Sequence, residues 1–145
     1  MWSTEQKKIL KDFCDLNGIA GLLEQITENG NLLCDQVAFT LMPSRQDTTS
    51  LRVFVQFGQP PAAQAVMVYR RLLELNLLMP QERYERLGVE PESGAVIFTY
   101  QLASPTAESM LASLRHAAAH ARAWQLSYFL DDEPDSLLVA LGEYT

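Results

Sequence analysis

The chain has 145 residues, 48% of them hydrophobic and 20% charged, which is the composition of one globular domain with a sizeable core. Its formal net charge of −7 argues against a nucleic-acid partner, because binding to phosphates needs clustered Lys and Arg. The sequence has no run of about 18 apolar residues, so we expect no membrane insertion. Residues 1–8 resemble a helix start more than a signal peptide, which favours a cytoplasmic protein.

The first predicted element is a helix over about residues 4–16. Ser3 and Gln6 form a capping box, in which each side chain bonds the backbone of the other residue. Apolar residues follow at helical spacing, namely Ile9, Leu10, Phe13 and Leu16. The pair Asn17-Gly18 ends the helix, since both residue types tolerate a left-handed cap.

Three consecutive antiparallel strands are predicted next, over residues 22–26, 32–42 and 51–57. Between the first two, Asn29-Gly30 fits a tight hairpin turn. The third strand has the clearest alternation, with Leu51, Val53, Val55 and Phe57 on one face. Phe54 therefore lies on the other face.

A second helix is predicted over residues 61–78, opened by Pro60-Pro61 and ended before Pro80. It is apolar on two adjoining faces, with little more than Arg70 and Glu74 polar between them. A helix that covers one face of a sheet needs only one apolar stripe. We therefore expect a two-fold homodimer through this helix, with Val66, Met67, Tyr69, Leu72 and Leu75 as the candidate interface residues.

The C-terminal half predicts a polar edge strand over residues 83–89, a central strand over 95–102 and a long helix capped by Ser104-Pro105. Residues 136–145 are predicted to be a loose tail. The order is then α-β-β-β-α-β-β-α in a single domain spanning 1–145. The fold class is α+β, with helices packed on a twisted antiparallel sheet.

Residues that carry chemistry are few. His116 and His120 have a spacing that suits zinc, but Ala117-Ala118-Ala119 between them lacks the glutamate of metalloproteases. We interpret them as two solvated, dispensable histidines. Cys14 and Cys34 are expected to be reduced thiols, with a disulfide between them as the alternative. With no nucleophile elbow and no glycine-rich phosphate loop, the sequence predicts no enzyme, no metal and no cofactor.

Apolar residues on both faces of the predicted sheet leave two arrangements open. Helices could cover both faces, or one face could stay uncovered and take a segment of a partner, with an edge strand available for strand addition. Phe54 is the clearest candidate for an uncovered apolar side chain.

Several local patterns resemble the class I type III secretion chaperones, the family that includes the Tir chaperone. The resemblance spans about residues 4–130. It rests on the helix exit Phe13…Asn17-Gly18-Ile19, the turn Glu28-Asn29-Gly30 into Leu32-Leu33-Cys34-Asp35, the helix end Leu72-Leu73-Glu74-Leu75-Asn76, the turn Ser93-Gly94-Ala95-Val96-Ile97-Phe98, and a closing helix with Trp124.

This resemblance implies a homodimeric chaperone of the bacterial cytosol that works without ATP. Such a chaperone keeps the N-terminal segment of a secreted effector extended and ready for secretion. The client is expected over the first helix and the first three strands, with Leu10, Phe13, Leu23, Phe39, Leu41 and Phe54 as candidate contacts. The alternative is a cytosolic interaction domain, such as an immunity protein or a regulatory adaptor, that binds a folded partner.

Overall fold

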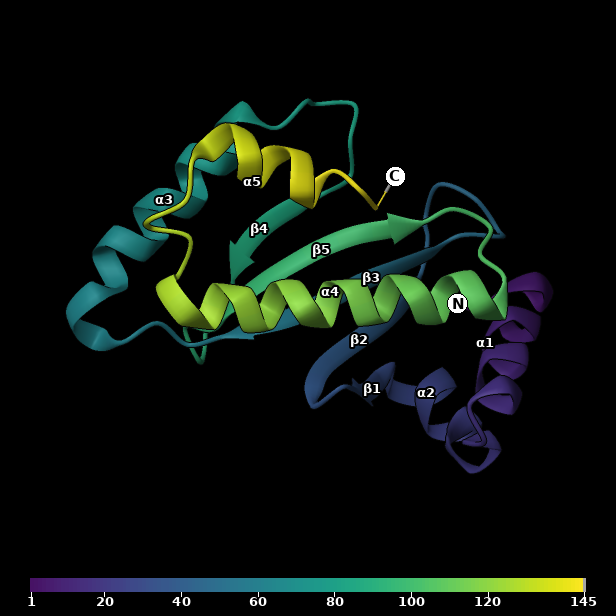
Figure 1. The fold of residues 1–145 in the computed structure, drawn as a ribbon. Helices are drawn as coiled ribbons and strands as arrows, with labels where there is room; N and C mark the ends of the chain where they lie inside the picture. Colours follow the sequence, from purple (N-terminus) through teal and green to yellow (C-terminus); the bar gives the residue numbers. More distant parts are fainter. Residues whose placement is uncertain (145) are drawn as a thin grey trace.

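A five-stranded antiparallel sheet in the order β1-β2-β3-β5-β4 forms the centre of the protein in the computed structural model, which describes residues 1–144 (Figure 1). The strands are β1 (Asn31–Cys34), β2 (Val37–Pro43), β3 (Leu51–Gly58), β4 (Arg86–Val89) and β5 (Val96–Leu102). The helices are α1 (Thr4–Leu16), α2 (Leu23–Asn29), α3 (Ala65–Leu78), α4 (Ala107–Ser127) and α5 (Pro134–Leu141), with short 3₁₀ turns η1 (Ala20–Leu22) and η2 (Ala62–Gln64). The α+β prediction is confirmed.

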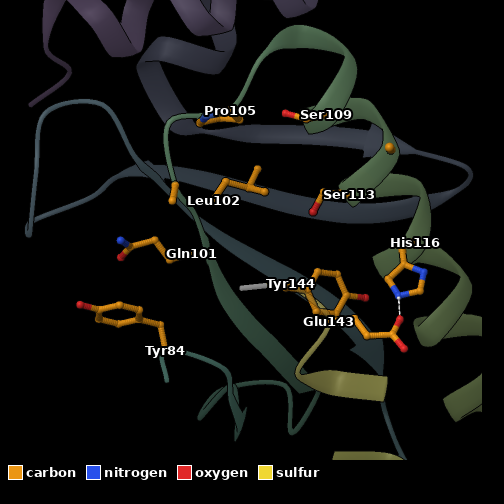
Figure 2. Close-up of a pocket in the computed structure, with 11 residues that line it drawn as sticks. Tyr84, Gln101, Leu102, Pro105, Ser109, Ser113, His116, Glu143 and Tyr144 are labelled. Atoms are coloured by element: carbon orange, nitrogen blue, oxygen red, sulfur yellow. Dashed lines mark ion pairs between the residues drawn. The ribbon is translucent and has the colours of Figure 1, made fainter. Parts of the chain in front are cut away.

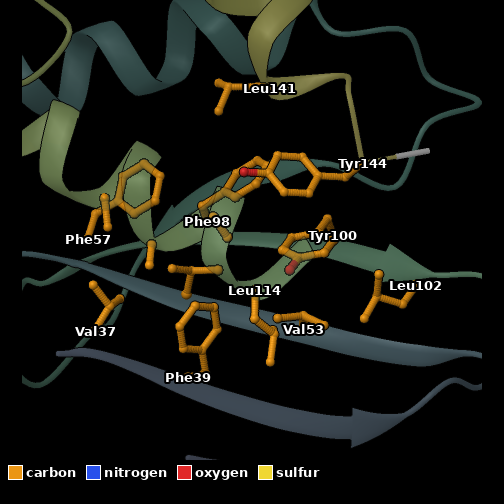
Figure 3. Close-up of a cluster of buried hydrophobic side chains, with 14 of the residues drawn as sticks. Val37, Phe39, Val53, Phe57, Phe98, Tyr100, Leu102, Leu114, Leu141 and Tyr144 are labelled. Atoms are coloured by element: carbon orange, nitrogen blue, oxygen red, sulfur yellow. The ribbon is translucent and has the colours of Figure 1, made fainter. Parts of the chain in front are cut away.

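The core lies between one face of the sheet and α4, which packs over β3 and runs back in roughly the opposite direction to β5 (Figure 1). Alternate residues of a strand point to opposite faces, so the apolar residues predicted on one side of β3 are all fully buried. The Phe57 ring centroid lies 6.0 Å from that of Trp124 of α4 and 5.8 Å from that of Phe98. Phe98, Tyr100 and Tyr144 continue this cluster of aromatic rings (Figure 3). One sheet face is therefore covered, and the other is left to the surface.

The capping box of α1 forms as predicted and also fixes a loop. The Ser3 side chain accepts a bond from the Gln6 backbone at 3.0 Å, and the Gln6 side chain accepts one from the Ser3 backbone at 2.8 Å. The Gln6 amide also donates to the Ser50 carbonyl at 2.8 Å, just before β3. The buried Gln6 thereby links the first turn of α1 to the loop between β2 and β3.

The prediction of a strand over residues 22–26 is wrong, because this segment belongs to η1 and α2. Gly30 caps α2 in the left-handed conformation, with φ +76°, and makes no hairpin turn. The predicted strand 32–42 is instead two strands, β1 and β2. Asp35 and Gln36 join them in a two-residue turn with φ values of 50° and 68°, the positive angles that such hairpins require.

The edge position predicted for residues 83–89 is confirmed, since β4 pairs only with β5. The outer edge of β4 is closed by Asn76 at the end of α3. Its side-chain amide donates to the Leu87 carbonyl at 2.6 Å and accepts from the Leu87 N–H at 2.9 Å. Strand addition at this edge is blocked at Leu87, because both of its outward backbone groups are already bonded.

The C-terminal segment differs from the loose tail that the sequence predicts. Residues 134–141 form α5, with Pro134 in the first turn, and α5 packs against α3. Leu137, Leu141 and Tyr144 are buried, and the Tyr144 ring lies 4.2 Å from that of Tyr100 (Figure 3). The cap of the long helix α4 is also corrected, from Ser104-Pro105 to Thr106.

The two histidines are only partly solvated, which corrects the prediction of two solvated side chains. Their rings lie 4.5 Å apart and both contact Tyr144, whose hydroxyl shares a hydrogen bond with His120. His116 Nε2 lies 3.0 Å from a carboxylate oxygen of Glu143. Burial, and then the nearby His116, lower the pKa of His120 below its usual 6.5. These contacts hold Glu143 and Tyr144 against α4.

We expect the protein to lose stability as the pH falls below about 6.5, because His120 then binds a proton more readily in the unfolded chain. Thermal unfolding between about pH 7.5 and about pH 5.5 measures this loss. Asp47 and Glu90, whose pKa values are lowered, titrate below this window. His120→Gln should flatten the dependence, and an unchanged slope in that variant would contradict the assignment.

Candidate functional site

The uncovered side of the sheet, here called the open face, keeps its side chains partly or fully exposed. It comprises residues that alternate with the core residues of β2, β3, β4 and β5: Thr40, Met42, Arg52, Phe54, Gln56, Arg86, Ile97, Thr99 and Gln101. Of the two arrangements that the sequence leaves open, the structure has the one with an uncovered face, and Phe54 lies on that face as the alternation of β3 predicts.

Phe54 stands at the centre of the open face. Thr40 of β2 and Thr99 of β5 are its neighbours across the sheet. Its half-buried ring lines two hollows, one of about 370 Å³ that extends to Tyr84 and one of about 320 Å³ that extends to Leu33. An aromatic side chain between two hollows can contact apolar groups that enter from either side.

The larger hollow also contains Arg52, two residues before Phe54 on β3. The Arg52 guanidinium donates to the Tyr84 carbonyl at 3.2 Å and lies 6.0 Å from the centre of the Tyr84 ring. Burial, and then the positive charge of Arg86, lower the pKa of Arg52. Two neighbouring guanidiniums thus give the open face a local positive charge on a chain of net charge −7.

The β1 edge borders the open face at the smaller hollow. Because the Leu41 N–H bonds the Gly30 carbonyl, the alternation of an antiparallel pair turns the backbone groups of Asn31 and Leu33 outward. The outward backbone groups of Asn31 are already bonded: its N–H donates to the Asn29 side chain at 2.9 Å, and its carbonyl accepts from the Gln25 side chain at 3.3 Å. Leu33, whose side chain is 72% exposed, is the position where a partner strand can add to this edge.

Four of the six predicted client contacts are corrected by the structure, which buries them in the core: Leu10, Phe13, Phe39 and Leu41. The first two face α4 from α1, and the last two lie opposite Val55 and Val53 on the covered side of the sheet. Leu23 on α2 and Phe54 remain partly exposed. Sequence reasoning missed Arg52 and Leu33, although strand alternation places Arg52 beside Phe54.

Helix α3 presents a second apolar surface, here called the α3 stripe: Val66, Met67, Leu73, Leu77 and Leu78. Val66, Leu73 and Leu77 recur at one helical face and are 81%, 72% and 84% exposed.

Two of the predicted interface residues, Val66 and Met67, belong to the α3 stripe. Leu72 and Leu75 are corrected, because both turn into the core of their own chain. Tyr69 is half-buried and donates to the Gly94 carbonyl at 2.9 Å.

A separate pocket of about 520 Å³ lies between the end of β5, the first half of α4 and the C-terminal segment (Figure 2). Its ionisable groups include His116 and Glu143, whose Nε2 and carboxylate oxygen lie 3.0 Å apart. Within residues 1–144, no three His, Cys, Asp or Glu side chains gather as a metal site would require. Cys14 and Cys34 are free thiols. In the same range, every helix is too short or too polar to cross a membrane.

Comparisons with solved structures find the same fold. The HopA1-SchA chaperone-effector complex contains a chain that matches with a TM-score of 0.56 and 16% identity, over 83% of this chain and 93% of that one. A chain of the ExsC-ExsE complex matches with a TM-score of 0.56 and 22% identity, over 88% of this chain and 96% of that one.

Among curated proteins, the comparison found no match. The sequence profile of the Tir chaperone protein (CesT) family, in contrast, matches residues 8–125, from the middle of α1 almost to the end of α4. That range includes the whole sheet with its open face and the α3 stripe. Because the match covers most of the chain, the protein belongs to the Tir chaperone protein (CesT) family.

Proposed function

We propose that the protein is a chaperone for type III secretion in the bacterial cytosol. It binds the N-terminal segment of a secreted effector, keeps the segment extended, and needs no ATP. The observation that carries the proposal is the open face, where the core leaves the apolar side chains of Met42, Phe54 and Ile97 uncovered, in a chain of the Tir chaperone protein (CesT) family. The two similar solved chains, which come from a chaperone-effector complex and from the ExsC-ExsE complex, support it.

The open face suits an extended segment. Apolar client side chains enter the two hollows beside Phe54, while the client backbone pairs with the free edge at Leu33. Burial of apolar surface, at roughly 25 cal/mol per Å², must exceed the entropy lost when the segment becomes ordered. The balance makes binding reversible, as delivery to a secretion apparatus requires.

A homodimer is part of this proposal. The α3 stripe is the apolar surface that a second copy covers, and a stable interface buries about 1,600 Å² in total. Arg70 and Glu74, which pair at 3.3 Å beside Leu73 and Leu77, form the polar rim. A two-fold axis near α3 leaves both open faces free for clients.

The role is proposed to be non-enzymatic and to require no cofactor. Its strongest support is family membership. In the pocket of about 520 Å³, His116 Nε2 lies 3.0 Å from a carboxylate oxygen of Glu143. This contact connects the C-terminal segment to α4.

Deletion of the gene in the source bacterium tests the function. We expect one or a few exported proteins to disappear from the culture medium, while other type III exports continue. The N-terminal fragment of a missing protein should then co-purify with this chain after co-expression. Unchanged secretion, or a fragment that binds only when folded, would contradict the proposal and favour an adaptor for folded partners.

Phe54→Ser should weaken binding of that fragment by several-fold to a hundred-fold, or roughly 1–3 kcal/mol, because one apolar anchor is lost. The variant should keep its thermal stability, since Phe54 points away from the core. Leu126→Ser is the matched control: Leu126 is 87% exposed on α4, on the other side of the sheet. Equal affinities of the two variants would move the client site away from the open face.

A further inference from the structure

Arg52 is held in place by the backbone and the ring of Tyr84, which carry no charge. The positive charge of Arg86 and the negative charge of Glu85 act on its guanidinium in opposite directions. Arg86 bonds the backbone carbonyl of Glu85 at 2.6 Å. The Glu85 side chain itself lies on the opposite side of the chain, where it lines a small cavity with Leu138 and Leu141 of α5.

The surroundings of Arg52 indicate that its positive charge attracts an anion. A half-buried guanidinium beside a like charge is electrostatically unfavourable unless an anion comes close. The hollow beside Arg52 is open and has room for one, and Arg45 at its rim adds a third positive charge. The chain as a whole has a net charge of −7, so this hollow is opposite in sign to the protein's net charge.

We infer that the hollow beside Arg52 binds a carboxylate side chain of the client, next to the apolar residue that contacts Phe54. This inference rests on the proposed function and specifies its client. The Arg52 guanidinium holds the carboxylate by charge-assisted hydrogen bonds, for which its planar fork is suited. Ring contact with Tyr84 keeps the guanidinium oriented before the client arrives.

The spacing of the two contacts predicts a pattern in the client. Arg52 and Phe54 are two apart on β3, so their side chains stand on the same face roughly 7 Å apart. Alternate residues of an extended client have the same separation. The client segment therefore carries an apolar residue and an Asp or Glu two positions away, in either direction according to how the segment runs.

A peptide array tests this inference. Peptides that tile the N-terminal segments of the exported proteins of the source bacterium are probed with the wild-type protein and with Arg52→Gln. For each bound peptide, every Asp and Glu is replaced in turn by Asn and Gln. One such replacement, two positions from an apolar residue, should weaken wild-type binding about tenfold or more. The same replacement should have little further effect on Arg52→Gln, because the partner charge is already gone.

Arg115→Gln on α4 makes the same change in net charge on the far side of the sheet and should bind like the wild type. Arg52→Lys keeps the charge without the fork and should recover part of the affinity. Peptides that bind wild type and Arg52→Gln equally, with no sensitive acidic position, would overturn this inference alone. No binding to the wild type would overturn the proposed function as well.

Discussion

Replacing Leu73 and Leu77 together by Glu should convert the proposed dimer into monomers. Both side chains belong to the α3 stripe and are exposed in the single chain, so the substitutions leave the core intact. In a two-fold dimer each protomer loses two apolar contacts. At roughly 1.5 kcal/mol for each buried leucine, the loss is about 6 kcal/mol, or about four orders of magnitude in Kd. Buried, unpaired carboxylates add to this loss.

Light scattering at micromolar concentration measures the change in mass. The matched control is Leu22→Glu with Leu126→Glu, which places two carboxylates at exposed leucines outside α3. The control should stay dimeric. A double variant of the α3 stripe that is still a dimer would place the interface elsewhere, and a monomeric wild type would remove the dimer from the proposal.

Elements with a clear local sequence pattern were predictable from the sequence. The capping box at Ser3 defines the start of α1, and β3 has an alternation that fits a sheet with one buried face. The side of β3 that carries Phe54 followed from that alternation. These features depend on neighbours within a few residues, which is the range over which periodicity and turn chemistry act.

Elements stabilised by distant contacts were not predictable in the same way. Residues 23–29 form too short a helix to be stable alone, and a short apolar run fits helix or strand equally well. Helix α5 is similarly short, and what holds it is the burial of Leu137 and Leu141 against the rest of the core.

The residues of the candidate site also divide into those set by local sequence pattern and those set by distant contacts. Leu10 and Phe13 are apolar residues of an amphipathic helix, but only the position of α4 shows that they are core residues. Arg52 carries no local signal that distinguishes it from other arginines. Its role depends on a contact with Tyr84, which is 32 positions away in the sequence. This contact forms only because β3, β5 and β4 lie side by side in that order in the sheet.

The junction between α2 and β1 has no room for a side chain at Gly30. Gly30 adopts φ +76°, and a Cβ atom added there would overlap the Leu41 carbonyl oxygen of β2. The carbonyl of Gly30 also accepts a hydrogen bond from the Leu41 N–H, the bond next to the β1–β2 pairing. A side chain at this position therefore acts on both strands, because neither backbone can move without breaking that bond.

Gly30→Ala should destabilise the protein by about 3 kcal/mol, the sum of left-handed strain and displacement of β2. Gly18→Ala separates the two causes. Gly18 has a similar φ of +67° at the end of α1, but an added Cβ there meets nothing within 4 Å. Its substitution should cost only about 1 kcal/mol, since strain is partly offset by the lower entropy of the unfolded chain. Urea unfolding of both variants gives the difference. Equal losses would mean that β2 yields freely, and that Gly30 serves only as a helix cap.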